Sequence, residues 1–197
     1  MILYLVSSNR HKYEEFRRML SDIVEVHWIQ ADYLEPQRDN LEEVAITSAL
    51  WLADHLPKPF FLEDAGLFIH ALGGFPGPFS SYVFSKLGNE GVIKLMYGVM
   101  DRRAEFVSVI ALHTGRELLT FVGKSKGEIS TEPRGGGWGF DPIFIPEGSE
   151  GRTFGELGEE KDKFSHRGAA VRELRQFLQG GRAQLFKNEP RSWGAEG

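Results

Sequence analysis

The 197-residue chain contains no cysteine. That absence excludes disulfides, thiolate zinc sites, iron–sulfur clusters and cysteine nucleophiles. Long hydrophobic runs are missing as well, since every apolar stretch is well short of the roughly 18 residues that a membrane helix needs. The apolar run at residues 2–6 has neither a basic segment before it nor a small-residue cleavage site after it. We therefore expect no signal peptide and a cytoplasmic protein.

Positive charge is also scarce. Lys and Arg number 23 against 28 Asp and Glu, which gives a formal net charge of −5 at pH 7. A general nucleic-acid-binding protein usually carries a basic excess or stripe, so we expect neither nucleic acid nor a membrane as a partner. A few well-placed cations can still bind a nucleotide. The phosphate-binding pattern GxxxxGK is absent, so a phosphate site in this chain must be built differently.

Hydrophobic residues make up 41 % of the chain, which is enough for one ordinary domain with a real core. Strand and helix patterns alternate in the first half of the sequence, and strand patterns dominate the second half. We therefore predict a single α/β domain over residues 1–180, with a mixed central sheet flanked by helices. The weak periodicity of residues 181–197 predicts a frayed, partly disordered C-terminal tail.

The spacing of apolar residues gives ranges for the individual elements. Strands are predicted at residues 2–6, 24–28, 60–62, 103–114, 117–129 and 141–145. Helices are predicted at residues 12–20, 41–55, 90–100 and 164–178. Loops are predicted at residues 32–40, 71–79 and 134–139, and the rigid loop at 71–79 is expected to be structural.

The first polar segment follows the strand at 2–6, where a helix is about to begin. It consists of Ser7, Ser8, Asn9, Arg10, His11 and Lys12. A turn that opens a helix exposes unpaired backbone N–H groups, which attract anions together with the helix dipole. The hydroxyls, the amide and the charge of Lys12 add to this affinity for phosphate. Taken alone, the segment is more simply explained as an ordinary N-cap with solvent-facing cations.

Two carboxylates, Glu63 and Asp64, follow the short strand at 60–62. The ends of strands in α/β sheets are common ligand sites, and adjacent strand residues point to opposite faces, so we expect one of the two acids to face a site. Asp64 has the chemistry to hold Mg²⁺ and to take a proton from an attacking water. A turn or N-cap aspartate is an equally good explanation.

A second metal ligand is predicted in the polar loop at 32–40. We assign it to Glu35, beside three nearby competitors, Asp32, Asp39 and Glu42. The carboxylate oxygens of such a loop suit Mg²⁺ when water and phosphate complete the shell.

A third segment combines aromatic rings with a carboxylate. It consists of Trp138, Gly139, Phe140 and Asp141. The rings offer faces for stacking on a flat base, and the carboxylate can accept hydrogen bonds from a base or a ribose. A turn that packs its aromatic residues into the core is the alternative.

The fourth segment places cations at the start of the last helix. It contains Lys161, followed by Ser165, His166 and Arg167. Ser165 is typical of an N-cap, so the next two residues are expected at the positive end of the helix, where Arg167 offers a planar fork of donors. For Lys161 the alternative is a solvated face, because charged residues surround it.

These segments, in this order, resemble the motifs of the Ham1 or inosine triphosphatase family. The motif T-G-N-x-x-K-x-x-E stands here as Ser7-Ser8-Asn9 with Lys12 and Glu15, and E-D-[ST]-G stands as Glu63-Asp64-Ala65-Gly66. The loop L-x-G-x-P-G stands as Leu72-Gly73-Gly74-Phe75-Pro76-Gly77, and F-G-[YW]-D stands as Trp138-Gly139-Phe140-Asp141. The motif E-K-N-x-x-S-H-R stands as Glu160-Lys161-Asp162 followed by Ser165-His166-Arg167. The resemblance spans roughly residues 2 to 178, and five ordered motifs make it specific.

The resemblance implies a mixed α/β fold with two lobes and a cleft between them. It implies hydrolysis of inosine, deoxyinosine and xanthosine triphosphates to the monophosphate and pyrophosphate, with Mg²⁺ as cofactor and a homodimer as assembly. By position, Asp64 matches the general base and a metal ligand, and Glu35 matches the other ligand. Residues 7–12 match the phosphate-binding turn, with Ala65 offering its backbone N–H. Residues 138–141, Lys161, His166 and Arg167 match the residues that hold the base.

The chain also departs from the family pattern. Ser8 replaces a glycine and Ala65 replaces a hydroxyl residue. The cations often found in the second helix and after the Pro-Gly loop are missing, since the chain has Ser80 and Ser81 at the second place. Phosphate neutralisation is thus expected to depend on Lys12, Arg10 and metal. Three alternatives remain: a Maf-like pyrophosphatase with a different base preference, a nucleotide-binding protein without turnover, and an α/β domain whose motifs are turns and caps.

Overall fold

The computed structural model of the chain describes residues 1–33 and 36–180. Its strands are β1 Ile2–Val6, β2 Glu25–Ile29, β3 Phe60–Ile69, β4 Pro76–Gly77, β5 Arg103–His113, β6 Leu118–Ile129 and β7 Phe144–Pro146. Its α-helices are α1 Arg10–Leu20, α2 Leu41–Leu52, α3 Ser80–Leu95, α4 Phe154–Leu157, α5 Lys161–Phe164 and α6 His166–Gln179. Short 3₁₀ turns are η1 His70–Leu72, η2 Asp141–Ile143 and η3 Gly158–Glu160. The tail predicted at 181–197 lies outside the described residues.

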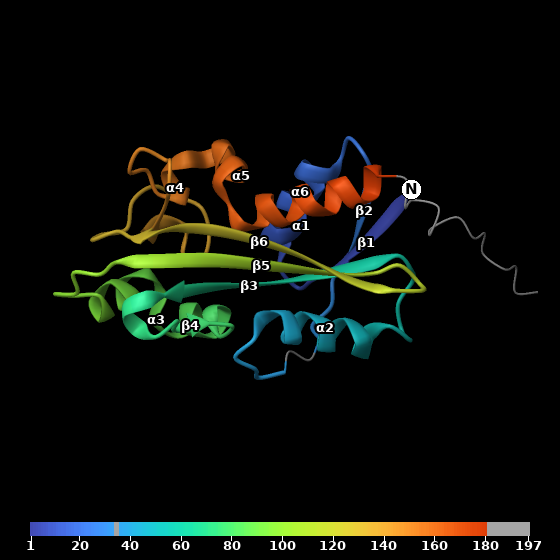
Figure 1. Cartoon of the computed structure of the whole chain (residues 1–197), viewed down its shortest axis with the longest axis horizontal. Coiled ribbons are helices and arrows are strands. Elements are labelled where there is room, and N and C mark those ends of the chain that lie inside the picture. Colours follow the sequence, from blue (N-terminus) through green and yellow to red (C-terminus); the bar gives the residue numbers. More distant parts are fainter. Residues whose placement is uncertain (34–35, 181–197) are drawn as a thin grey trace, which may run out of the picture.

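One mixed sheet carries the fold (Figure 1). Its strand order is β2-β1-β3-β5-β6-β7, with β4 paired to β3. The pairs β1–β2 and β1–β3 are parallel, and the pairs β3–β5, β5–β6 and β6–β7 are antiparallel. The prediction of an α/β domain with a mixed central sheet is therefore confirmed. Among the described residues, no helix combines the length and the apolar character needed to cross a bilayer.

Helices cover both faces of the sheet (Figure 1). On one face, α1 and α6 bury a cluster that includes Phe16 and Phe61. On the other face, α2 covers a cluster around Ala45, near the paired ends of β1 and β3. A further cluster with Phe106 and Phe144 lies toward the opposite end of the long strands. The long strands β3, β5 and β6 thus connect separate parts of the core.

Local sequence signals placed most elements within a few residues. Helix α1 begins at Arg10 because the Asn9 side chain caps it, with Oδ1 accepting from His11 N at 2.9 Å and from Lys12 N at 3.4 Å. Helix α6 begins after Ser165, whose Oγ accepts from Gly168 N at 2.9 Å. The ranges predicted for β1, β2, β5, β6 and α2 also agree with the structure to within three residues.

The extent predicted for the third strand was wrong. The predicted strand at 60–62 is β3, which continues to Ile69. The prediction ended the strand at Glu63 and Asp64 because charged residues usually leave the core. Both are instead buried within the strand, at 1 % and 5 % exposure. A buried carboxylate needs a counter-charge or hydrogen bonds, so this position already points to a site.

The segment between β3 and β5 also differs from its prediction. The predicted loop at 71–79 contains part of η1 and the short strand β4. The predicted helix at 90–100 is α3, which begins at Ser80 and ends at Leu95. Gly88 interrupts α3 with φ 60° and ψ −168°, a conformation that favours glycine. Helix α3 carries exposed apolar residues such as Tyr82 and Leu87, so its apolar residues do not mark one buried face. The first half of the helix was therefore not predicted from the sequence.

The strand predicted at 141–145 begins later. Asp141, Pro142 and Ile143 form the 3₁₀ turn η2, and β7 starts at Phe144. Pro142 lacks the N–H that a strand ladder needs, which explains the shift. The four-residue helices α4 and α5 were not predicted, because one turn of helix is too short to show periodicity.

Candidate active site

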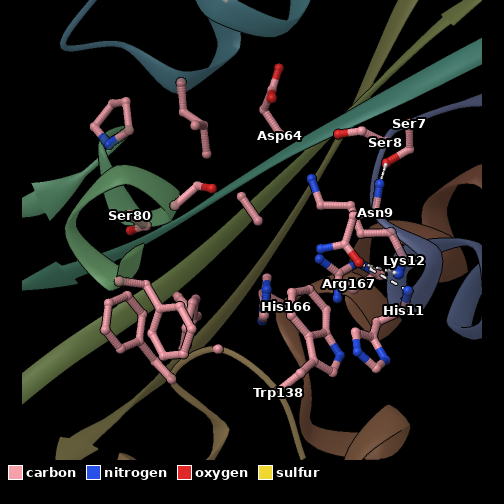
Figure 2. Close-up of a pocket in the computed structure, with 18 of the residues that line it drawn as sticks. Ser7, Ser8, Asn9, His11, Lys12, Asp64, Ser80, Trp138, His166 and Arg167 are labelled. Carbon is pink, nitrogen blue, oxygen red and sulfur yellow. Dashed lines mark hydrogen bonds between the residues drawn. The ribbon is translucent and has the colours of Figure 1, made fainter. Parts of the chain in front are cut away.

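A cavity of about 450 Å³ opens beside the middle of β3 (Figure 2). Strand β1 pairs with β3 only as far as Phe61, and β4 pairs with it from Leu67 onward. On the edge opposite β5, the part of β3 between these residues has no strand partner among residues 1–33 and 36–180. The cavity reaches this open edge, so side chains from both faces of the sheet contribute to its wall.

Nearly all the predicted site residues meet at this cavity. Its lining includes Ser7, Ser8, Asn9, His11, Lys12, Asp64, Ala65, Trp138, Gly139, Phe140, Asp141, Lys161, His166 and Arg167. These residues come from the start of α1, from β3, from the turn before η2, and from α5 and α6. Segments that lie far apart in the sequence therefore face one volume.

Two predicted residues remain, Arg10 and Glu35. Arg10 does not line the cavity, and its exposed guanidinium pairs with Glu14 at 2.8 Å. Glu35 lies outside the described residues. Among its competitors, Asp32 lines the cavity, whereas the Glu42 carboxylate accepts a hydrogen bond from Thr120 Oγ1 at 2.5 Å.

The turn before α1 is held by its own side chains and by β2. Asn9 N donates to Ser7 Oγ at 3.0 Å, and Trp28 Nε1 donates to the Ser7 carbonyl at 2.7 Å. Asn9 Oδ1 is occupied as the helix cap. The N-cap explanation is thus correct for Asn9, and it is compatible with anion binding because the capped helix start itself borders the cavity.

The two acids of β3 point in opposite directions, as strand alternation predicts. Asp64 lines the cavity (Figure 2). Glu63 points to the opposite face of the sheet. There its carboxylate accepts hydrogen bonds from Ser108 Oγ at 2.6 Å and from Arg167 Nε at 3.1 Å. Lys12 Nζ lies 3.0 Å from the same carboxylate and also donates to the Glu63 carbonyl at 2.7 Å.

Glu63 belongs to a charge network that forms one wall of the cavity. The network consists of the acids Glu15, Glu63 and Asp141 and the cations Lys12, Lys161 and Arg167. Lys161 Nζ donates to Glu15 at 2.9 Å and to Asp141 at 2.8 Å. Arg167, only 1 % exposed, bridges Glu15 and Glu63. Because acids and cations are equal in number, the wall carries little net charge of its own.

The cations decide the ionisation of two network acids. Burial alone would raise the pKa of Glu63, but Arg167 and Lys12 outweigh it and lower the pKa to about 2. Burial of Glu15 is likewise outweighed by Arg167 and Lys161, which hold its pKa well below the ordinary value. Asp141 differs, because burial raises its pKa despite the nearby Lys161. Asp141 is therefore the network carboxyl that takes up a proton first as the pH falls.

Trp138 is fixed within this wall. Its Nε1 donates to Glu15 at 3.0 Å, and its ring stacks on His11 at a centroid distance of 5.6 Å. The cationic groups of Lys161 and Arg167 lie 5.3 and 5.2 Å from the ring centroid. In Figure 2 the indole lies between His11 and His166. The ring is thus a preset surface rather than a freely rotating one.

His166 is a buried, uncharged part of the lining. Burial, and next to it the charge of Arg167, hold the pKa of His166 well below its ordinary value. Its ring stacks on Phe106 at 4.4 Å, and its Nδ1 has no hydrogen-bond partner among the described residues. A neutral imidazole contributes directional hydrogen bonding to a ligand rather than charge.

Several lining residues were missed from the sequence. They are Ala31, Tyr33, Leu41, Val44, Pro78, Phe84 and Phe106. All except Tyr33 are apolar residues that resemble ordinary core positions in a single sequence. Ser80 and Ser81 also line the cavity. The sequence had drawn attention to these two positions, because they stand where the family often has a cation.

Asp32 and Asp64 line the same cavity, and both offer carboxylate oxygens that suit a divalent cation. Mg²⁺ usually takes one or two protein carboxylates, and water and substrate phosphates complete its shell. Within residues 1–33 and 36–180, no group of three or more His, Asp or Glu side chains is placed to hold a metal. The donor set therefore suits an ion that arrives together with a phosphate ligand.

Comparisons with known proteins identify the family of the chain. A dITP/XTP pyrophosphatase from Korarchaeum cryptofilum is 62 % identical over 176 residues, which cover 89 % of this chain and 95 % of the relative. A dITP/XTP pyrophosphatase from Thermococcus kodakarensis is 51 % identical, with 90 % and 97 % covered. The solved structure of a HAM1 protein from Coxiella burnetii superposes with a TM-score of 0.79 at 33 % identity, over 92 % of this chain and all of that one. The model of the Ham1 family matches residues 3–177, and the chain therefore belongs to the Ham1 family.

Proposed function

We propose that this protein hydrolyses inosine, deoxyinosine and xanthosine triphosphates to the nucleoside monophosphate and pyrophosphate. One observation carries the proposal: Asp64, the start of α1 and four members of the charge network line the same cavity. Two relatives that match along most of the chain are named dITP/XTP pyrophosphatases. The cavity volume of about 450 Å³ is in the ordinary range for a small-molecule site.

In the mechanism that we propose for this hydrolysis, Asp64 activates the attacking water. Its carboxylate orients the water and takes its proton while the water oxygen attacks the α-phosphorus and pyrophosphate leaves. Asp64, together with Asp32 or Glu35, would also hold Mg²⁺, which supplies charge neutralisation for the phosphates when it is bound. The start of α1 and Lys12 donate to the phosphate oxygens and stabilise the negative charge that grows on the leaving group.

The proposed selection among bases depends on the N–H donors of Arg167 and Lys161 that are not used within the charge network. Arg167 has five N–H donors, and three are used by Glu15 and Glu63. Lys161 has three donors, and two are used by Glu15 and Asp141. The remaining donors favour a carbonyl at position 6 of the purine over an amino group. An unmet buried donor costs on the order of 1–3 kcal/mol, or roughly ten- to hundredfold in rate.

A panel of triphosphates tests the proposal. Pyrophosphate release is measured with ITP, dITP, XTP, GTP, ATP and CTP in the presence of Mg²⁺. We expect kcat/KM for ITP, dITP and XTP to exceed that for ATP by at least about tenfold. Preference for CTP would favour a Maf-like activity instead. Tight binding of ITP without pyrophosphate release would favour a protein that binds nucleotides without turnover.

We also propose that the protein forms a homodimer. The proposal is supported by large exposed apolar residues in and after α3, including Tyr82, Leu87, Tyr97 and Met100. Large apolar side chains that remain exposed in this number are typical of interfaces between proteins when they lie together. Light scattering coupled to gel filtration measures the mass directly. A mass near 22 kDa, that of one chain, would contradict the proposal.

A further inference from the structure

Helix α3 touches the aromatic turn Trp138–Asp141 at two points, one on each side of its break at Gly88. Before the break, the Phe84 ring meets Phe140 edge-on, with centroids 5.3 Å apart and an interplanar angle of 87°. After the break, Asn89 Nδ2 donates to the Gly139 carbonyl at 3.1 Å. Both Phe84 and the turn line the cavity, so these contacts connect α3 to the site.

The turn depends on outside support at Gly139. Its internal hydrogen bonds join Asp141 N to the Trp138 carbonyl at 3.2 Å and Trp138 N to the Asp141 carboxylate at 3.2 Å. Gly139 has φ 59°, a left-handed conformation that favours glycine, and its carbonyl takes part in neither of those bonds. Asn89 provides a donor for that carbonyl, and the position of Asn89 depends on the break at Gly88.

We propose that Asn89, together with Phe84, braces the aromatic turn from α3, and that Asn89 is a positioning residue for base recognition. The proposal rests on the proposed function, in which the base binds at the end of the cavity lined by Lys161 and Arg167. The turn places Trp138 and Phe140 in the lining of the same cavity. Because the turn is held at both Phe140 and Gly139, its aromatic rings keep a fixed position relative to a base bound in the cavity. Trp138 and Asp141 keep their bonds to Glu15 and Lys161, so loss of the Asn89 bond loosens the part of the turn at Gly139 and Phe140. A looser Phe140 ring weakens stacking on any base and lowers the selectivity among bases.

The amide of Asn89 is poorly suited to a purely structural role. Its Oδ1 is buried and has no hydrogen-bond partner among the described residues. A buried, unpartnered carbonyl oxygen disfavours the folded state, and an apolar residue of similar size avoids that cost. Asn89→Leu removes this orphaned oxygen together with the donor of the Gly139 carbonyl, so the two contributions to Tm oppose each other and we expect Tm to change little while the turn loosens. A nearly unchanged Tm beside weaker binding distinguishes positioning from packing.

The experiment compares wild type, Asn89→Leu and Asn89→Asp, with Glu90→Gln as the control at the exposed neighbouring position. Steady-state pyrophosphate release is measured with dITP and dATP, and hydrogen exchange is measured on the free protein. For Asn89→Leu we expect KM for dITP to rise about five- to tenfold with kcat within about twofold, and the preference for dITP over dATP to fall. Exchange in residues 134–141 is expected to accelerate by a similar factor, while exchange in α6 stays constant. Asn89→Asp replaces the donor with an acceptor and should show an equal or larger effect.

The outcomes separate the two proposals. If wild type releases no pyrophosphate from any triphosphate, the proposed function fails, and with it the role in base recognition. The exchange measurement then still decides whether Asn89 braces the turn. If wild type is active but Asn89→Leu leaves KM, base preference and exchange unchanged, the brace is refuted. A fall in Tm with faster exchange throughout the molecule would also refute it, because it would show a general structural role.

Discussion

In the proposed function, the base end of the cavity lies at Lys161 and Arg167 and the phosphate end lies at the start of α1 and Asp64. The two ends are built in contrasting ways. At the base end, Lys161 and Arg167 are buried and each is bound by two carboxylates of the chain. At the phosphate end, the lining is made of backbone, hydroxyls, the carboxylates of Asp32 and Asp64 and the ammonium of Lys12, and the neighbouring Ser8 and Ser81 are exposed. The base end is therefore preorganised by the protein, whereas the phosphate end leaves much of the charge compensation to its ligand and metal.

The two ends are nevertheless connected through Glu63. Its carboxylate contacts Lys12 on the phosphate side and Arg167 on the base side. A triphosphate that attracts the ammonium of Lys12 competes with Glu63 for it. Glu63 would then depend more strongly on Arg167, so filling the phosphate end should tighten the base end. The following predictions test the contrast between the ends, beginning with the largest effect.

Asp64→Asn should lower kcat by about a thousandfold or more, because an amide cannot take the proton of the attacking water. Nucleotide binding should stay within about fivefold, since the charge network and the start of α1 remain intact. Pyrophosphate release measures the first effect, and calorimetry with ITP measures the second. Asp39→Asn is the control, because Asp39 does not line the cavity. Full activity of Asp64→Asn would remove Asp64 from the catalytic role.

Arg167→Met tests how strongly the base end is organised by charge. The substitution removes a buried counter-ion shared by Glu15 and Glu63, and breaking such a buried pair typically costs about 3–5 kcal/mol of stability. Urea unfolding measures the loss. Arg175→Met provides a matched control on the same helix, because the solvent-screened pair of Arg175 with Asp22 should contribute far less to stability. Equal losses for the two variants would contradict a preorganised base end.

Acid should weaken the same network. The pKa of Glu63 is lowered from 4.5 to about 2 in the folded protein, so the stability it contributes is present above pH 4.5 and is lost as the pH falls toward 2. The loss should reach at most about 3 kcal/mol at this one group. Urea unfolding at a series of pH values measures it. Glu63→Gln should show a shallower fall over this interval, and an identical slope would show that Glu63 is not the titrating group.

The parts of this molecule that local chemistry determines could be predicted from the sequence. The caps Asn9 and Ser165 fix the starts of α1 and α6 within two residues, because a cap depends on its nearest neighbours. The convergence of the four polar segments was also anticipated, but through resemblance to a family rather than through spacing. Spacing along one chain does not report which segments meet in space.

The partners of the buried charges could not be predicted. Glu63 appeared to end a strand, because the cations that stabilise it come from α1 and α6, far away in the sequence. For Lys161 the alternative to a binding role was a solvated face among other charges, yet Lys161 is buried between Glu15 and Asp141. In both cases a long-range ion pair reverses the usual preference of a charged residue for the surface.

The smallest predicted effect concerns the phosphate end. Ser81 lines the cavity at the start of α3 and is exposed, so a lysine there would place a second cation beside the bound phosphates. Ser81→Lys should lower KM for ITP by about three- to tenfold at low ionic strength, with kcat nearly unchanged, and salt should reduce the gain.

Ser85→Lys gives the matched control for Ser81→Lys. Position 85 is exposed on the same helix, one turn further on, and does not line the cavity, so its added charge should leave KM within about twofold. If the two lysines act equally, the gain comes from long-range attraction of an anionic substrate rather than from contact with phosphate. If neither lysine lowers KM, the phosphate end already neutralises the charge of the bound phosphates. The contrast in charge compensation between the two ends would then have no effect on substrate binding.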